Sequence, residues 1–132
     1  MKKIFITTLA FCFSAVLYAQ EKTAAEKLAQ EQLDAYNNRD IEAFLKPYSD
    51  SVQVYFFPNQ FLYKGKETMR KEYAGMFANT PDLHCNLKSR VVVGNRVIDE
   101  ESVVFDKNKP AFHAVAIYTV ANGKITAVHF IQ

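Results

Sequence analysis

The chain has 132 residues, of which 49% are hydrophobic and 23% are charged, and its formal net charge at pH 7 is +2. This length and apolar content suit a single domain with one hydrophobic core. A net charge so close to zero gives no strongly basic surface, so we exclude nucleic acid as a partner.

The first segment, residues 1–19, predicts a cleavable signal peptide. Lys2 and Lys3 precede an apolar run from Ile4 to Leu17, and Ala19 is a small residue at the expected cleavage site. The run is shorter than the ~20 residues that span a bilayer, so we expect no membrane association after cleavage. The remaining domain, 20–132, would then be exported to the periplasm or the medium.

Cleavage changes both the charge and the cysteine content. It would remove two lysines and no acidic residue, which lowers the net charge from +2 to zero. Cys85 would be the only remaining cysteine, and no intramolecular disulfide could form. Cys85 lies in an apolar strand pattern, which favours a core residue over a nucleophile.

Two helices follow. Thr23 to Glu26 has the capping-box pattern, and apolar residues at helical spacing continue to Tyr36, with Gln32 in the middle of the apolar stripe. Asp40 can cap a short second helix from Ile41 to Lys46, which Pro47 ends.

The rest of the chain predicts strands and one further helix. A strand from Val52 to Phe57 ends at Pro58, a short strand covers 61–63, and a helix follows Gly65. Four strands come next, at 83–93, 96–105, 111–120 and 124–132, with turns at Gly94-Asn95 and Asn122-Gly123. Helices collected on one face of such an antiparallel sheet give an α+β domain.

Several stretches together resemble the SnoaL-like, or nuclear transport factor 2-like, superfamily. They are residues 36–44, 48–52 and 63–70, together with Pro58 and the C-terminal hairpin 118–132. The resemblance implies a cone-shaped, strongly bent antiparallel sheet wrapped around three N-terminal helices, with an internal pocket. Ketosteroid isomerases and polyketide cyclases of this group transfer protons in the pocket, whereas other members only bind ligands or partners. The fold therefore does not decide the function.

The isomerase residues of the group can be compared position by position. The general-base Asp precedes the Pro that ends the first strand, and that position is Phe57. The oxyanion-hole Tyr corresponds to Gln32, and the protonated Asp corresponds to Ala116. A general base must be titratable. We therefore do not expect ketosteroid isomerase chemistry by the familiar route.

The Gly94-Asn95 turn predicts cross-strand pairs. Counting back from the turn places Arg90 opposite Asp99 and Lys88 opposite Glu101. One interpretation is a solvated ladder of ion pairs, opposite the more apolar face of Cys85, Leu87, Val91 and Ile98. In the other, Arg90, Asp99 and Glu101 form a polar floor in the pocket. Asp99 or Glu101 would then be a candidate catalytic acid or base, with Arg90 as electrostatic stabiliser.

The last hairpin allows two registers. A two-residue Asn122-Gly123 turn would pair Tyr118 with Ala127, whereas a bulged turn would pair Ala116 with Val128 and Ala114 with Phe130. The resemblance supports the bulged form. The residues that would then share the pocket face are Phe112, Ala114, Ala116, Tyr118, Val128 and Phe130.

The outer face of the same hairpin is apolar enough to need a cover. Its residues are His113, Val115, Ile117, Ala127, His129 and Ile131. We expect a homodimer packed through this face. The histidines at 84, 113 and 129 match no local ligand spacing and the chain has no glycine-rich phosphate loop, so no metal or cofactor is predicted.

Our main prediction is an exported domain that binds a small, largely apolar molecule in its cone cavity. The predicted lining consists of Gln32, Tyr36, Tyr55, Phe57, Tyr73, Tyr118 and Phe130. Two alternatives stay open. One is an enzyme of the isomerase, cyclase or lyase kind, and the other is a dimeric interaction module without a ligand.

Overall fold

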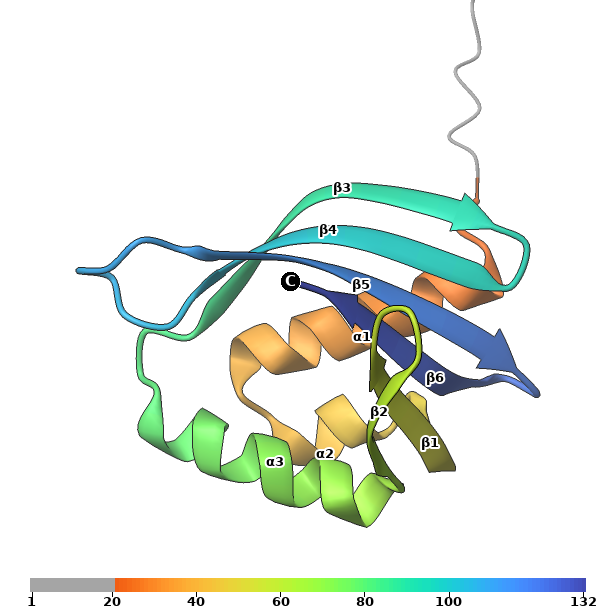
Figure 1. The fold of residues 1–132 in the computed structure, drawn as a ribbon, viewed down its shortest axis with the longest axis horizontal. Coiled ribbons are helices and arrows are strands. Elements are labelled where there is room, and N and C mark those ends of the chain that lie inside the picture. The colour runs from red at the N-terminus through yellow and green to blue at the C-terminus, as the bar shows by residue number, and fades with distance from the viewer. Residues whose placement is uncertain (1–20) are drawn as a thin grey trace, which may run out of the picture.

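A computed structural model describes residues 21–132 (Figure 1), so the predicted signal peptide and its cleavage site lie outside the described residues. Helix α1 (Ala24–Asn38) begins where the side chain of Thr23 accepts a hydrogen bond from the backbone N–H of Glu26, as the capping-box pattern predicts. Helix α2 (Ile41–Leu45) is capped in the same way by Asp40. Both helices therefore begin at the predicted capping residues.

A third helix and six strands complete the domain. The third helix, α3, spans Lys66–Asn79. The strands are β1 (Tyr48–Phe56), β2 (Gln60–Lys64), β3 (His84–Val93), β4 (Arg96–Val104), β5 (Phe112–Ala121) and β6 (Lys124–Ile131). They form one sheet in the order β2-β1-β6-β5-β4-β3. Strand β1 begins earlier than the predicted Val52 because its first residue, Tyr48, already pairs with β6.

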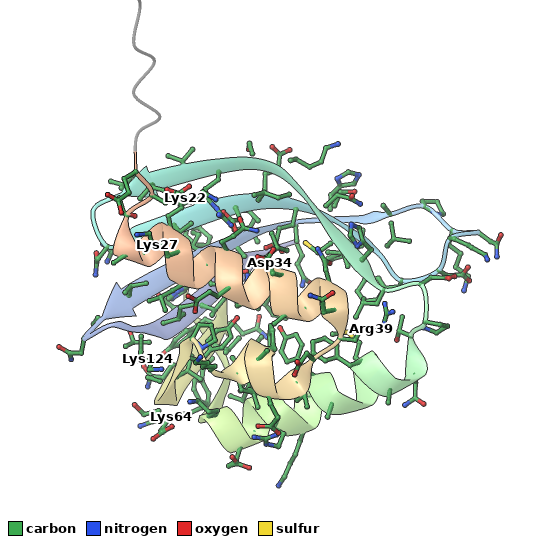
Figure 2. The ribbon with its side chains drawn as sticks, turned by 180° about the vertical axis from the view of Figure 1, so that it is seen from behind. Lys22, Lys27, Asp34, Arg39, Lys64 and Lys124 are labelled. Carbon is green, nitrogen blue, oxygen red and sulfur yellow. The ribbon has the colours of Figure 1, made fainter. Side chains whose placement is uncertain are left out.

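The helices cover one face of a bent sheet, as predicted (Figure 1). Figure 2 shows α1 in front of the sheet, with Lys27 and Asp34 on the side that points away from it. The opposite side of α1 buries Ala25, Ala29 and Leu33 in the core. In residues 21–132, no helix is long and apolar enough to cross a membrane.

One strand pairing differs from the predicted antiparallel sheet. Strands β3 to β6 form the expected antiparallel meander, but β1 runs parallel to β6, so the sheet is mixed. Antiparallel neighbours in the meander are joined by short turns. The connection between β1 and β6 instead runs through most of the domain, and no turn dictates their relative direction.

The β3–β4 hairpin contains a bulge that the sequence did not reveal. Arg90 faces Asp99 as predicted, but the register shifts between Leu87 and Ser89, and Leu87 rather than Lys88 lies opposite Glu101. The predicted Lys88–Glu101 pair is therefore wrong. One extra residue reverses which side chains point inward. Cys85 and Leu87 consequently share a face with Arg90, instead of lying opposite it.

The β5–β6 hairpin follows neither predicted register in full. Its turn has two residues, because Ala121 pairs with Lys124, but the pairing register shifts by one residue between Thr119 and Val120. Ala116 therefore pairs with Phe130 and Tyr118 with Val128, so both sets of predicted pairs are wrong. The residues predicted to share the pocket face still share one face of the sheet. The register shift moves the alternation of side chains by one position, as the bulged turn would have done.

Candidate functional site

A cavity of about 290 Å³ lies between the sheet and the helices. Each of the three helices and six strands contributes to its lining. The residues from the helices are Gln32, Leu33, Tyr36, Phe44, Glu72, Tyr73 and Met76. Those from the strands, the β4–β5 loop and the C-terminus are Tyr48, Val54, Phe56, Leu62, Tyr63, Cys85, Glu101, Val103, Phe105, Phe112, Ala114, Tyr118, Phe130 and Gln132. The volume is close to the lower end of the ~300–1,000 Å³ typical of small-molecule sites.

Two of the seven predicted lining residues lie elsewhere. Tyr55 stacks on His129 on the outer face of the sheet, with ring centroids 4.7 Å apart, and Phe57 is 57% exposed. Val54 and Phe56 take the inward positions on β1. Side chains alternate along a strand, so a prediction that begins on the wrong residue misplaces every member of the set. The other five, Gln32, Tyr36, Tyr73, Tyr118 and Phe130, are in the lining.

Aromatic rings form one wall of the cavity. Phe44 lies 4.6 Å from Tyr73, 5.3 Å from Tyr48 and 6.1 Å from Tyr36, measured between ring centroids. These tilted contacts add to the stabilisation from burying the rings. Burial raises the pKa of Tyr36, Tyr48 and Tyr73, so their hydroxyl groups stay neutral at physiological pH.

A chain of hydrogen bonds crosses the inner end of the cavity. The Tyr48 hydroxyl donates to Gln32 Oε1 over 3.2 Å, and Gln32 Nε2 donates to the Tyr118 hydroxyl over 3.0 Å and to the Ala29 carbonyl. The Tyr118 hydroxyl in turn donates to Glu101 Oε1 over 3.1 Å. Gln32 is thus the fully bonded centre of a network, which explains a polar residue in the apolar stripe of α1.

Glu101 is the buried acid of this network. It is 7% exposed and belongs to the cavity lining. Burial raises the pKa of Glu101 from 4.5 to about 7, against the opposing effect of the hydrogen bond from Tyr118. A carboxyl group with this pKa exists in both protonation states near neutral pH, and it can give or accept a proton there.

Asp99 and Arg90 form a separate buried ion pair. Arg90 Nε and Nη2 each lie 2.7 Å from a carboxylate oxygen of Asp99, and Arg90 Nη1 donates to Gln30 Oε1 over 2.9 Å. Asp99 is fully buried, so the interpretation as a solvated ion ladder is wrong. Neither residue lines the cavity. Of the three predicted catalytic candidates, only Glu101 lies where a ligand can reach it.

Apolar residues surround the entrance. Leu62, Phe105 and Phe112 line the cavity and are also at least 36% exposed. They come from β2, from the β4–β5 loop and from the start of β5, so they mark the side on which the cavity meets the surface. A ligand that enters here passes apolar side chains before it reaches Glu101.

Sequence reasoning missed three informative lining residues. Tyr48 was outside the predicted strand, Phe44 belonged to a short helix with no evident inward face, and Cys85 was placed on the opposite face because of the β3 bulge. Burial raises the pKa of Cys85 to about 12, so its thiol stays protonated and packs as an apolar group. Tyr36, Phe44 and Tyr48 lie on three different elements, so no local spacing signals the aromatic wall.

The fold and site define a class: a cone-shaped α+β domain whose bent sheet and helices enclose a cavity with a polar inner end. The family model described as "SnoaL-like domain" matches residues 29–128, and the chain belongs to that family. Comparison with the curated proteins finds no match.

Solved structures agree with this assignment. A cystatin-fold protein from Novosphingobium aromaticivorans is 25% identical, with a TM-score of 0.74 over 85% of this chain and 100% of that one. A SnoaL-like protein from Burkholderia thailandensis is 18% identical, with a TM-score of 0.69 over 82% of this chain and 92% of that one. An LEH-like epoxide hydrolase of M. tuberculosis is 14% identical, with a TM-score of 0.65 over 81% of this chain and 80% of that one. The last two likenesses show the fold alone.

Proposed function

We propose that this domain binds a small, largely apolar molecule in its cavity, with one polar group of that molecule held at Glu101. The observation that carries the proposal is the combination of a cavity of about 290 Å³ with mainly apolar and aromatic walls and one buried polar network. Binding sites for small molecules have this composition, because apolar walls supply affinity and a few polar groups fix the orientation.

Blocking the cavity tests the proposal directly. Ala114 lines the cavity on β5, and the Ala114→Phe variant would fill the space with a ring. Ala121 is exposed at the end of the same strand and lies outside the cavity lining, so Ala121→Phe is the matched control. Native mass spectrometry of protein purified without denaturation should show a bound molecule in the wild type and in the control, and none in Ala114→Phe. Equal occupancy in all three proteins would refute the proposal.

A second candidate function is proton-transfer catalysis of the isomerase, cyclase or lyase kind. The specific observation in its favour is a carboxyl group in the cavity whose pKa is about 7, which suits a general base at neutral pH. The experiment follows deuterium uptake from D₂O at the carbon next to the carbonyl group of small apolar ketones. The exchange rate should fall at least 100-fold in Glu101→Gln, in keeping with typical general-base contributions. Equal rates in both proteins would exclude Glu101 as the base.

We also propose that the domain forms a dimer through the outer face of the β5–β6 hairpin. Support comes from the partly exposed Val115, Ile117 and His129 and from Ile131, which is 41% exposed. Burial of this surface against a second copy would remove apolar area from water. Sedimentation at micromolar concentration should give a dimer for the wild type and a monomer for Ile117→Lys. A monomeric wild type would refute this assembly.

Export remains a further proposal, based on the amino-terminal pattern of Lys2, Lys3 and the apolar run that follows. Expression of the full chain in a bacterial host with an export system, followed by mass measurement of the purified product, tests it. The proposal expects a chain that begins at Gln20 in the periplasmic or extracellular fraction. A full-length chain in the cytoplasmic fraction would contradict it.

A further inference from the structure

We infer that the ligand of this cavity is a cationic amphiphile, namely an organic ammonium group attached to a small apolar or aromatic body. The inference rests on the proposed function and names the chemical class of the ligand. The first observation is the charge of the lining. Among the described residues that line it, the acidic side chains are Glu72 and Glu101, and there is no lysine, arginine or histidine. A cavity of this kind attracts cations and repels carboxylates.

The second observation is the direction of the hydrogen bonds around Glu101. The Tyr48 hydroxyl proton points to Gln32, both Nε2 protons of Gln32 are used on Ala29 and Tyr118, and the Tyr118 proton points to Glu101. Every donor of this network is therefore already engaged. With Glu101 ionised, the network itself offers a ligand only acceptors, so a polar group that binds at Glu101 has to be a donor.

The position of Glu101 gives that acceptor its strength. Only 7% of this residue is exposed. Among the described residues, Tyr118 is the one hydrogen-bond partner of its side chain. A carboxylate that is withdrawn from water interacts strongly with a charged donor, because there is little solvent to screen the pair. An ammonium group would fill this role better than a neutral hydroxyl or amide.

The third observation is the aromatic wall beside the acid. Tyr36, Tyr48 and Tyr73 line the same cavity as Glu101. Phe44 lies among them, at 4.6 Å from Tyr73 and 5.3 Å from Tyr48. Ring faces attract cations, most strongly where both are shielded from water. A carboxylate with aromatic neighbours is thus complementary to an alkylammonium group and to the apolar body that carries it.

The protonation state of Glu101 predicts how the affinity for a ligand changes with pH. Burial raises the pKa of Glu101 and the charge of Asp99 raises it further, whereas the hydrogen bond from Tyr118 and the charge of Arg90 lower it. The carboxyl of Glu72, the phenols of Tyr36, Tyr48 and Tyr73 and the thiol of Cys85 line the same cavity. An ammonium ligand binds the carboxylate form, so its affinity rises as the pH passes upward through about 7. A neutral ligand that accepts a hydrogen bond needs the protonated form, and its affinity falls over the same range.

Three matched probes test the inference: 3-phenylpropylamine, 3-phenylpropan-1-ol and 3-phenylpropanoate. Calorimetric titration of the wild type at pH 8 should show the amine binding about tenfold more tightly than the alcohol, since a charge-assisted hydrogen bond exceeds a neutral one by about 1.4 kcal/mol. The propanoate should bind most weakly. Between pH 6 and pH 8, the amine affinity should rise about tenfold, in proportion to the ionised fraction of Glu101.

Two variants test whether the preference for the amine depends on Glu101. In Glu101→Gln the preference for the amine over the alcohol should disappear. In Glu100→Gln it should persist, because Glu100 is exposed on the other face of β4 and bonds to Ser89. If Glu101→Gln does not fold, the pH dependence of the wild type is the test. An alcohol that binds as tightly as the amine, or an amine affinity that falls with pH, would overturn the inference and leave the proposed function intact. If none of the three probes binds, the proposed function fails as well.

Discussion

Two carboxylates on strand β4 share a face of the sheet and have different surroundings. Asp99 is fully buried, and both of its oxygens are bound by the guanidinium of Arg90. Glu101 is almost as deeply buried, but it accepts one hydrogen bond, from Tyr118, and belongs to the cavity lining. The two residues are one alternation apart on the same strand, so the strand itself does not explain the difference.

Asp99 and Glu101 are both buried, so burial alone does not identify a functional acid. The charge of Asp99 is neutralised by a bidentate partner, which makes the pair a part of the framework. Within residues 21–132, no cationic side chain contacts Glu101, and burial raises its pKa to about 7. A buried acid that lacks a cation and faces a cavity is available to a ligand or a proton, whereas a paired one is not.

The largest expected effect comes from breaking the structural pair. The Arg90→Ala variant would leave the Asp99 carboxylate buried without a partner, and we expect the free energy of unfolding at pH 8 to fall by about 3–5 kcal/mol. Urea denaturation followed by circular dichroism measures this. Replacement of both residues together, as Arg90→Met with Asp99→Leu, should recover most of the loss. A decrease below about 1 kcal/mol for Arg90→Ala would mean that the pair is solvated.

The next effect concerns pH and distinguishes Glu101 from Asp99. The folded state holds the Glu101 proton up to a pKa of about 7, whereas its ordinary value is 4.5. Between these values the folded state binds more protons than the unfolded chain, so the free energy of unfolding falls as the pH rises. At 1.36 kcal/mol per pH unit, this loss approaches about 3 kcal/mol.

Denaturation of the wild type and of Glu101→Gln from pH 4.5 to pH 8 tests this linkage. The variant should lack the part of the slope that Glu101 contributes, and it should be the more stable protein at pH 8. Glu100→Gln is the control, because its side chain is exposed and bonded to Ser89 on the other face. Superimposable pH profiles for the wild type and Glu101→Gln would contradict the assignment.

A smaller effect is expected when the hydrogen bond to Glu101 is removed. Tyr118→Phe deletes the donor to Glu101 and an acceptor for Gln32 Nε2, which should cost roughly 1–3 kcal/mol. The hydrogen bond from Tyr118 lowers the pKa of Glu101, so this pKa should rise further in the variant. Tyr55→Phe is the matched control, because the Tyr55 hydroxyl donates to Gln53 Oε1 on the outer face, away from Glu101. An unchanged pKa of Glu101 in Tyr118→Phe would show that the bond is absent in solution.

The smallest effect is expected at Lys88. The residue is exposed at the β3 bulge, and Leu87 rather than Lys88 lies opposite Glu101. Lys88→Ala should change the free energy of unfolding by no more than about 0.5 kcal/mol, and it should leave the pKa of Glu101 unaltered. If the pKa of Glu101 rises in Lys88→Ala, Lys88 does pair with Glu101, as an unbulged hairpin predicts.

Local signals made much of the fold predictable, and the bulges limited the prediction of the site. Thr23 and Asp40 begin helices because their side chains bond free backbone N–H groups, and the Gly94-Asn95 turn fixed the pairing of Arg90 with Asp99. The extra residue at Lys88 has no distinctive sequence signal, yet it moved Cys85 into the cavity. Register errors of one residue reverse a face, and only tertiary packing resolves them.

The sequence also did not reveal which side chains of β1 point to the cavity, for a different reason. Tyr55 and Phe57 are as apolar as Val54 and Phe56, so composition does not say which alternate set faces the helices. The pairing of β1 with β6 decides it, and that contact joins opposite ends of the domain. Gln32, in contrast, was predictable, because a polar residue within an apolar helical stripe requires buried partners.

The most direct test of the central claim is the titration of the Glu101 side chain itself. Carbon-13 NMR of the carboxyl carbon in the free protein, assigned by comparison with Glu101→Gln, gives its pKa without a ligand or an assay. We predict a midpoint of about 7, because the carboxyl is buried at the cavity and no cation in the described part of the chain contacts it. A midpoint near the ordinary value of 4.5 would show a solvated or paired carboxylate, and it would contradict the distinction between Glu101 and Asp99.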